Sequence, residues 1–238
     1  MEPEFSKPLS ELPAFLSTIS MVVDDRAAIV QQLVQAERKS PPIYAPARDL
    51  FIEVLEGNFS FEGAFTQALR LSDVIERRCA TEILSVSERY LRRESHCRVR
   101  LFPRMDYFLP NGMPLDVTPM WLRHSNPSRL MILHFWQTPL SSWQLSAAAA
   151  VIRSALLRQH PQYSACEIDF ISASLSPYGP HRRFEQYNWS KLKPLGDDDL
   201  RRFWKQFLTA WSEYQHRPPR EIRRTRAPGL FDKWPKSG

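Results

Sequence analysis

The order of helical and extended patterns along this chain predicts an α/β protein with a mixed central sheet. Apolar side chains follow helical spacing through about residue 93, whereas residues 98–136 alternate or run apolar as β-strands do. An S-x-x-Q capping sequence, Ser141 to Gln144, then opens a further helix, and another apolar segment follows at 167–175. We therefore expect an α-β-β-β-α-β core with a helical N-terminal portion before it and a basic C-terminal tail after it.

The N-terminal portion, residues 1–93, is predicted to pack on that core. Prolines within the first 20 residues indicate an extended arm there. Helices are expected next, from apolar stripes or from start and stop signals, over 24–39, 47–56, 60–71 and 73–93. Gly57 follows the second of these helices, where a residue in the left-handed conformation commonly ends a helix.

The core domain is expected over residues 94–216. Asn111-Gly112 separates two extended segments, and because both residues tolerate positive φ they predict a hairpin. Residues Arg129–Trp136 are almost continuously apolar, which favours a central strand buried on both faces. The remaining segments are predicted as strands at 98–102, 105–109, 114–122 and 167–175, a loop at 176–195 with a short strand near 184–189, and helices at 141–158 and 197–214.

Composition excludes several classes of protein. With 238 residues, 43% of them hydrophobic, the chain can bury a substantial core, and no apolar run approaches the roughly 18 residues of a membrane helix. The N-terminus lacks the features of a secretory signal, and Cys79, Cys97 and Cys166 match neither a disulfide framework nor a metal motif. We expect a cytoplasmic protein with reduced thiols and no membrane partner. Both glycine-rich nucleotide fingerprints are missing from the sequence, so no nucleotide cofactor is predicted.

Positive charge is concentrated in the proline-containing tail, residues 217–238. This segment holds seven basic residues and two acidic ones, so it contributes +5 of the net charge of +6. Such a tail suits phosphates or an acidic protein surface, or it contacts no ligand. The tail residues that we predict to bind nucleic acid are Arg220, Arg223, Arg224 and Arg226. An apolar cluster in the tail is predicted to dock in the groove of a protein partner or to fold back on its own domain, and it consists of Leu230, Phe231 and Trp234.

A second basic segment, residues 180–193, interleaves cations with aromatic residues. Arg182, Arg183, Lys191 and Lys193 can grip phosphates while neighbouring aromatic rings stack on bases. The alternative is that the aromatic residues anchor a long loop and leave the cations in solvent.

The predicted core has acidic residues near one strand, and the later strand ends in three aromatic or imidazole side chains. Asp116 follows Pro114-Leu115, with Asp106 as a rival, and the later strand ends in His134-Phe135-Trp136. In this order, residues 81–176 resemble the RecB-type core of the PD-(D/E)xK nuclease superfamily, which places an acidic motif near one strand and D-x-K on the next. The resemblance extends to three positions on the flanking helices, Gln144, Glu82 and Glu88.

The resemblance implies metal-dependent chemistry on nucleic acid, with Mg²⁺ or Mn²⁺ held by carboxylates. In an active enzyme the metal ligands would be Asp106 and Asp116, and the catalytic set would be Asp116, His134 and Gln137. However, His134 and Trp136 occupy the positions of a carboxylate and of the lysine, and tryptophan cannot ligate a cation. The arginines available to replace that lysine are Arg123, Arg129 and Arg153.

We therefore predict a catalytically degenerate PD-(D/E)xK-like protein without a cofactor. It would bind nucleic acid or a partner complex, as an accessory factor of a bacterial DNA-handling system. The alternatives are an active Mg²⁺- or Mn²⁺-dependent nuclease with a rearranged site, and a protein-interaction module that binds no nucleic acid. Simpler interpretations stand beside these at single positions: Asp116 as a turn residue, His134 as a hydrogen-bonded core histidine and Gln144 as part of the capping box.

Overall fold

The computed structural model describes residues 5–6, 9, 11–36, 43–118, 120–124, 128–136, 138–176, 179, 181–188, 191–217 and 220–221. Its elements, in chain order, are β1 (Phe5–Ser6), α1 (Phe15–Met21), α2 (Arg26–Ala36), α3 (Ala45–Glu56), α4 (Phe61–Leu69), α5 (Val74–Glu94), β2 (Arg98–Leu101), β3 (Asp106–Phe108), β4 (Pro114–Asp116), β5 (Trp121–His124), β6 (Arg129–His134), α6 (Ser142–Gln159), the 3₁₀ helix η1 (Pro161–Tyr163), β7 (Glu167–Leu175), β8 (Arg182–Asn188), α7 (Asp197–Gln215) and β9 (Arg220–Glu221). None of the described helices is long and apolar enough to cross a membrane.

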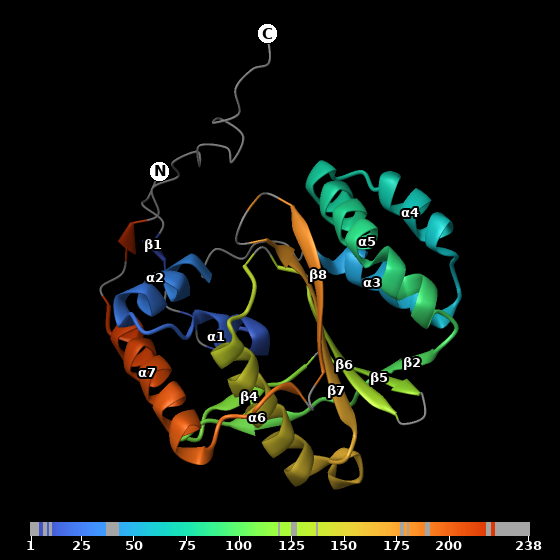
Figure 1. Ribbon diagram of the computed structural model, residues 1–238. Helices are drawn as coiled ribbons and strands as arrows, with labels where there is room; N and C mark the ends of the chain where they lie inside the picture. Colours follow the sequence, from blue (N-terminus) through green and yellow to red (C-terminus); the bar gives the residue numbers. More distant parts are fainter. Residues whose placement is uncertain are drawn as a thin grey trace.

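A mixed sheet forms the centre of the described part of the molecule, with five strands in the order β2-β5-β6-β7-β8 (Figure 1). The strands β2, β5 and β6 form an antiparallel meander, β6 and β7 are parallel, and β8 pairs antiparallel with β7. Helix α6 connects the two parallel strands, as such a pair requires. The segment α5-β2-β5-β6-α6-β7 therefore has the predicted α-β-β-β-α-β order, and the α/β fold class is confirmed.

The predicted hairpin is also confirmed, but it leaves the central sheet. Strands β3 and β4 pair with each other as a separate ribbon, and Gly112 sits at its turn with φ +82°. The prediction of one strand over 114–122 was wrong, because this stretch is divided between β4 in the ribbon and β5 in the sheet. The break has a local cause: the side chain of Asp116 accepts a hydrogen bond from the backbone N–H of Thr118 at 2.9 Å, which is an Asx turn.

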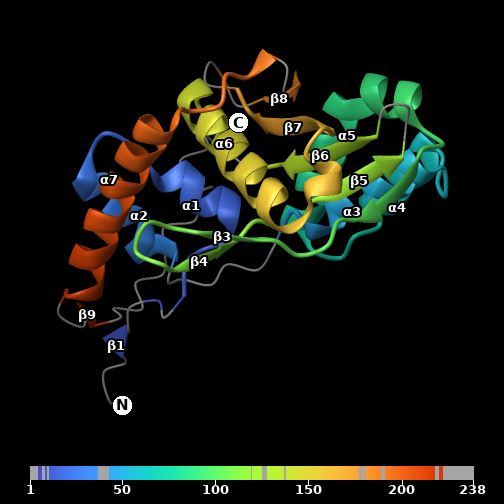
Figure 2. The same cartoon turned by 90° about the horizontal axis from the view of Figure 1, so that it is seen from below.

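Two hydrophobic cores lie on opposite faces of the sheet (Figures 1 and 2). One core joins α1, α2, α6, α7 and the ribbon, and its alanines on α6, Ala147–Ala149, let that helix lie close to the strands. The other core joins α3, α4 and α5. Alternate residues of β6 enter the two cores, Leu130 and Ile132 on one face and Met131 on the other, so this strand is buried on both faces as predicted. Residues 1–93 therefore contribute to both cores.

The ends of the described chain differ from the sequence expectation in two places. Within the predicted extended arm, residues 15–21 form α1, because Phe15 and Ile19 bury one side of a helical turn and Thr18 bonds the carbonyl of Pro13. The short strand expected near 184–189 is confirmed as β8, which begins two residues earlier, at Arg182, because its backbone groups pair along the edge of β7.

Candidate functional site

The ribbon brings the two predicted metal-binding carboxylates together and places an arginine beside both. Asp106 and Asp116 are opposite each other in the β3–β4 register, and Arg104 lies 3.5 Å from one carboxylate and 3.3 Å from the other. Asp116 also accepts a hydrogen bond from the Thr118 hydroxyl. A divalent cation at this position would therefore have to displace the guanidinium, and it would find two carboxylates as ligands. Among the described residues, no three His, Cys, Asp or Glu side chains gather as a metal site.

His134, at the end of β6, is buried rather than open to a ligand. The residue is 2% exposed, and its Nδ1 lies 3.4 Å from the hydroxyl of Ser172, its register partner on β7. Its Nε2 has no hydrogen-bond partner among the described residues. Burial lowers the pKa of His134 to about 4, so the ring is neutral at physiological pH. His134 and Asp116 stand in different sheets with separate partners and do not form a joint site, and Gln137 lies outside the described residues.

Arg182, predicted to contact nucleic acid, is instead a buried structural residue. Its side chain is 3% exposed, and it donates to the carbonyls of Phe135 and Ala173 at 3.0 and 2.6 Å. Its Nε lies 3.2 Å from the Glu82 carboxylate, and the guanidinium lies over the Tyr44 ring at 5.4 Å. The prediction for Arg182 is therefore corrected, because strand β8 turns this side chain inward. Glu82, the helix carboxylate of the nuclease resemblance, is engaged by the same arginine.

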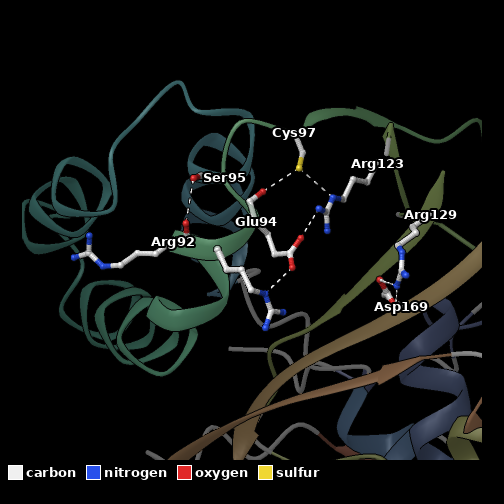
Figure 3. Close-up of polar contacts among 8 residues, drawn as sticks. Arg92, Glu94, Ser95, Cys97, Arg123, Arg129 and Asp169 are labelled. Carbon is white, nitrogen blue, oxygen red and sulfur yellow. Dashed lines mark hydrogen bonds and ion pairs between the residues drawn. The ribbon is translucent and has the colours of Figure 1, made fainter. Parts of the chain in front are cut away.

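Two of the three arginines available to replace the missing lysine, Arg123 and Arg129, are engaged as well (Figure 3). Arg123 on β5 forms an ion pair with Glu94 at the end of α5 and donates to the Cys97 sulfur at 3.2 Å. Arg129 on β6 pairs at 3.1 Å with Asp169, a carboxylate with no exposed surface. These contacts tie α5, β5, β6 and β7 together on one face of the sheet. No short-range pattern marks Asp169 or Glu94 in the sequence, because their partners are distant along the chain.

The ends of β5 and β6, where the resemblance would place catalytic groups, are apolar. A pocket of about 280 Å³ lies there between α1 and the start of α3, and we call it the aromatic pocket. Five ring side chains contribute to its lining, namely Phe15, Tyr44, Trp121, Phe135 and Trp136. Arg48 supplies the charged group and lies 5.9 Å from the Trp121 ring centre. Such a lining favours an apolar guest with one polar contact rather than phosphoryl chemistry.

A second hollow, the basic groove, is lined by residues of the ribbon, α6 and α7. Figure 2 shows the arrangement of these elements. It has a volume of about 570 Å³, and Arg153, Arg158 and Arg201 line it together with one described acidic residue, Asp197. Two large apolar side chains at this groove are about half exposed, Phe108 at 52% and Leu157 at 54%. The neighbouring hollow of about 770 Å³ shares Pro110 and Arg201 with it and adds four titratable residues, Arg26, Lys205, Glu213 and His216, of which Arg26 and Glu213 form an ion pair at 3.2 Å.

The basic groove was missed in the sequence because its residues come from three separate elements. The helical periodicity of α6 and α7 shows which positions are exposed, but not that the two exposed edges adjoin the ribbon. The stacking of Tyr107 on Trp204, with ring centres 5.8 Å apart, fixes the ribbon against α7. Hydrogen bonding between Asp106 and Gln159 fixes it against the end of α6.

The other residues predicted to bind nucleic acid or a partner have mixed positions. Arg183 is exposed and lies 3.4 Å from Glu185, and Lys191 and Lys193 are exposed beside α6, where Leu195 bonds the backbone of Ser146. The backbone of Arg220 belongs to β9. The remaining predicted residues lie outside the described part of the chain: Arg223, Arg224, Arg226, Leu230, Phe231 and Trp234.

Comparison with known proteins adds no further constraint. None of the protein-family models, curated proteins or solved structures compared with this chain matches it.

Proposed function

We propose that this protein binds nucleic acid in the basic groove and does not cleave it. The observation that supports this proposal best is that three arginines and two half-exposed apolar side chains line the same hollow. Cations neutralise phosphates, and an exposed ring such as that of Phe108 offers a surface on which a base can stack. In this proposal the chain is a PD-(D/E)xK-like protein in a cytoplasmic setting, an accessory factor that holds nucleic acid for another component.

The absence of hydrolysis is proposed from the partners of the acidic residues. Arg182 engages Glu82, Arg129 engages Asp169, and Arg104 lies within ion-pair distance of both ribbon carboxylates. The Arg104 contacts are exposed and weak, so the proposal depends more on the missing further ligand: among the described residues, no three His, Cys, Asp or Glu side chains gather around a common point. The runner-up, an active nuclease, would need these ion pairs to open.

Three cations at the basic groove and the neighbouring hollow are open to phosphates. Arg158, which lines the groove, and Lys205, which lines the neighbouring hollow, are exposed. Arg201 lines both hollows and pairs with Asp198 at 3.6 Å, where both side chains are at least 75% exposed. Exposed pairs of this kind contribute little, so a phosphate can replace the carboxylate.

Fluorescence anisotropy with labelled single- and double-stranded DNA over a salt series tests this proposal. The logarithm of the association constant falls linearly with the logarithm of the salt concentration. For a duplex, each lost phosphate contact reduces the magnitude of that slope by about 0.9. The triple variant Arg158→Gln, Arg201→Gln and Lys205→Gln is therefore expected to lower the slope by about 2 to 3. The matched control neutralises three exposed arginines elsewhere, Arg70, Arg89 and Arg98.

An equal loss of slope in the control triple variant would show that binding is not located in the groove. Cleavage is measured in the same samples with Mg²⁺ or Mn²⁺ added. Metal-dependent cleavage that disappears in Asp116→Asn would overturn the non-hydrolytic part of the proposal and establish the alternative, a rearranged nuclease site.

A further inference from the structure

We infer that the aromatic pocket is the docking site of the chain's own C-terminal segment, residues 230–234. The aromatic pocket shares no lining residue with the basic groove, and the inference does not depend on nucleic-acid binding. It rests on the chemistry of the pocket, on the chemistry of the segment and on the length of chain between them.

The aromatic pocket presents an apolar floor with one charged group at its rim. Phe135 and Trp121 are buried at its base, whereas Leu16, Leu133 and Trp136 are half-buried around it. Apolar surface left at such an opening favours a guest that removes it from water. Aromatic side chains are the usual anchors in pockets of this kind.

Arg48 gives the aromatic pocket its preference for charge. Its guanidinium has one described ion-pair partner, the adjacent residue Asp49 at 3.0 Å, and that carboxylate is 65% exposed. An exposed contact of this kind contributes little to stability. A guest with a carboxylate next to an apolar anchor can therefore displace Asp49 and form a more buried pair with Arg48.

The segment Leu230-Phe231-Asp232-Lys233-Trp234 has this composition. Phe231 offers an aromatic anchor, and Asp232 places a carboxylate directly beside it. The surrounding tail is basic and rich in proline, so this short segment is the apolar part of residues 222–238. Short peptides with apolar anchors at fixed spacing are a common form of groove ligand.

The described end of the chain is close enough for the segment to reach. Glu221 is the register partner of Phe5 in the β1–β9 pair. From Phe5 the chain leads to Ala14 at the rim of the aromatic pocket. Between them, the backbone N–H of Leu9 donates a hydrogen bond to the Tyr214 hydroxyl at 2.5 Å. Phe5 and Ala14 are nine positions apart along the chain, which limits the distance between them to about 30 Å. Glu221 and Phe231 are ten positions apart, so that stretch spans at most about 35 Å.

Docking within one molecule benefits from the short connection. A tethered segment whose connection spans the distance to its site experiences an effective concentration in the millimolar range. A segment that binds as a free peptide with a Kd of about 10 μM would thus fill the pocket in roughly 99 of 100 molecules. A free peptide then competes poorly with the tethered one, which gives a direct test.

The experiment titrates a fluorescein-labelled peptide of residues 226–238 into two full-length proteins. One is the natural chain, and the other carries Phe231→Ala and Trp234→Ala, which disable its own segment. We expect the peptide to bind the variant at least ten times more tightly than the natural chain, and a scrambled peptide to bind neither. Equal affinity for both proteins, or no binding to the variant up to millimolar peptide, overturns the inference.

A charge exchange then locates the peptide in the aromatic pocket. In the background of the disabled segment, Arg48→Glu should weaken binding of the natural peptide at least fivefold, and an Asp232→Lys peptide should recover that loss. Arg89→Glu on α5 is the matched control and should leave affinity unchanged. The Asp232→Lys peptide is also tested against the unaltered pocket, so the result does not depend on the folding of Arg48→Glu. Unchanged affinity for that peptide overturns the inference. Neither arm contains nucleic acid, so failure here leaves the basic groove untouched.

Discussion

Replacing Arg182 by methionine tests whether this arginine stabilises the fold or, as the sequence analysis predicted, contacts nucleic acid at the surface. Methionine keeps most of the length and apolar volume of the side chain but removes the guanidinium. The substitution leaves the carbonyls of Phe135 and Ala173 without this donor and leaves Glu82 without its partner. The neighbouring Arg183, 63% exposed in its pair with Glu185, provides the matched control.

The expected loss follows from these contacts. Removing one member of a buried ion pair costs about 3–5 kcal/mol. Glu82 is 33% exposed, so water can hydrate the abandoned carboxylate, and the lower limit of about 3 kcal/mol applies. Arg183→Met should cost less than about 1 kcal/mol because an exposed pair contributes little. Adding Glu82→Leu to Arg182→Met should restore about 1–2 kcal/mol, because no charge is then left without a partner.

Urea unfolding followed by tryptophan fluorescence measures these free energies, with the slope m checked for constancy. DNA affinity is measured on the same proteins under conditions where each is folded. A loss below about 1 kcal/mol for Arg182→Met, or a loss equal to that of Arg183→Met, would refute the structural role. Weakened DNA binding at unchanged stability would instead favour the sequence-based assignment of Arg182 to nucleic acid.

Two further predictions concern stability. His134 has a pKa of about 4 in the folded protein against 6.5 as its ordinary value, so the unfolded chain binds the proton more tightly. The neutral His134 ring contributes to the free energy of unfolding in full above pH 6.5, and this contribution, up to about 3 kcal/mol, is lost as the pH falls towards 4. His134→Phe should therefore make the free energy of unfolding in urea less dependent on pH over this range. An unchanged profile would contradict the burial of the ring. Gln144→Ala should cost about 2–3 kcal/mol by thermal or urea unfolding, since the Gln144 amide donates to the carbonyls of Ser20 and Val22 and completes the capping box with Ser141. Ser141→Ala removes the cap alone and should cost about 1 kcal/mol, so equal losses would argue against the link to α1.

The sequence by itself determined the features that depend on a few neighbouring residues. Asn111-Gly112 fixed the hairpin turn, and Gly57 ends α3 with φ +78° as predicted. The capping box opened α6, and the apolar run of β6 marked a strand buried on both faces. Each of these signals acts through backbone preference or periodicity over a short stretch, and none requires knowledge of a distant partner.

Only the tertiary structure decided which side chains meet. The sequence analysis placed Asp116 and His134 in one catalytic set. In the structure, an Asx turn leaves Asp116 in the ribbon, whereas His134 is buried at the end of β6 in the central sheet. The basic groove and the aromatic pocket each combine segments that are far apart along the chain. Contacts of this kind depend on how whole elements pack, which short-range patterns do not specify.

Arg182 and Arg183 show the physical reason most directly. They are consecutive, both basic, and indistinguishable by composition. On a strand, successive side chains point to opposite faces, so a shift of one residue in register would exchange their roles. The pairing of Arg182 with Leu175 and of Arg183 with Ser174 sends one guanidinium into the protein and leaves the other in solvent. The sequence supplied the strand and its two charges, and the register on β7 decided which charge is structural.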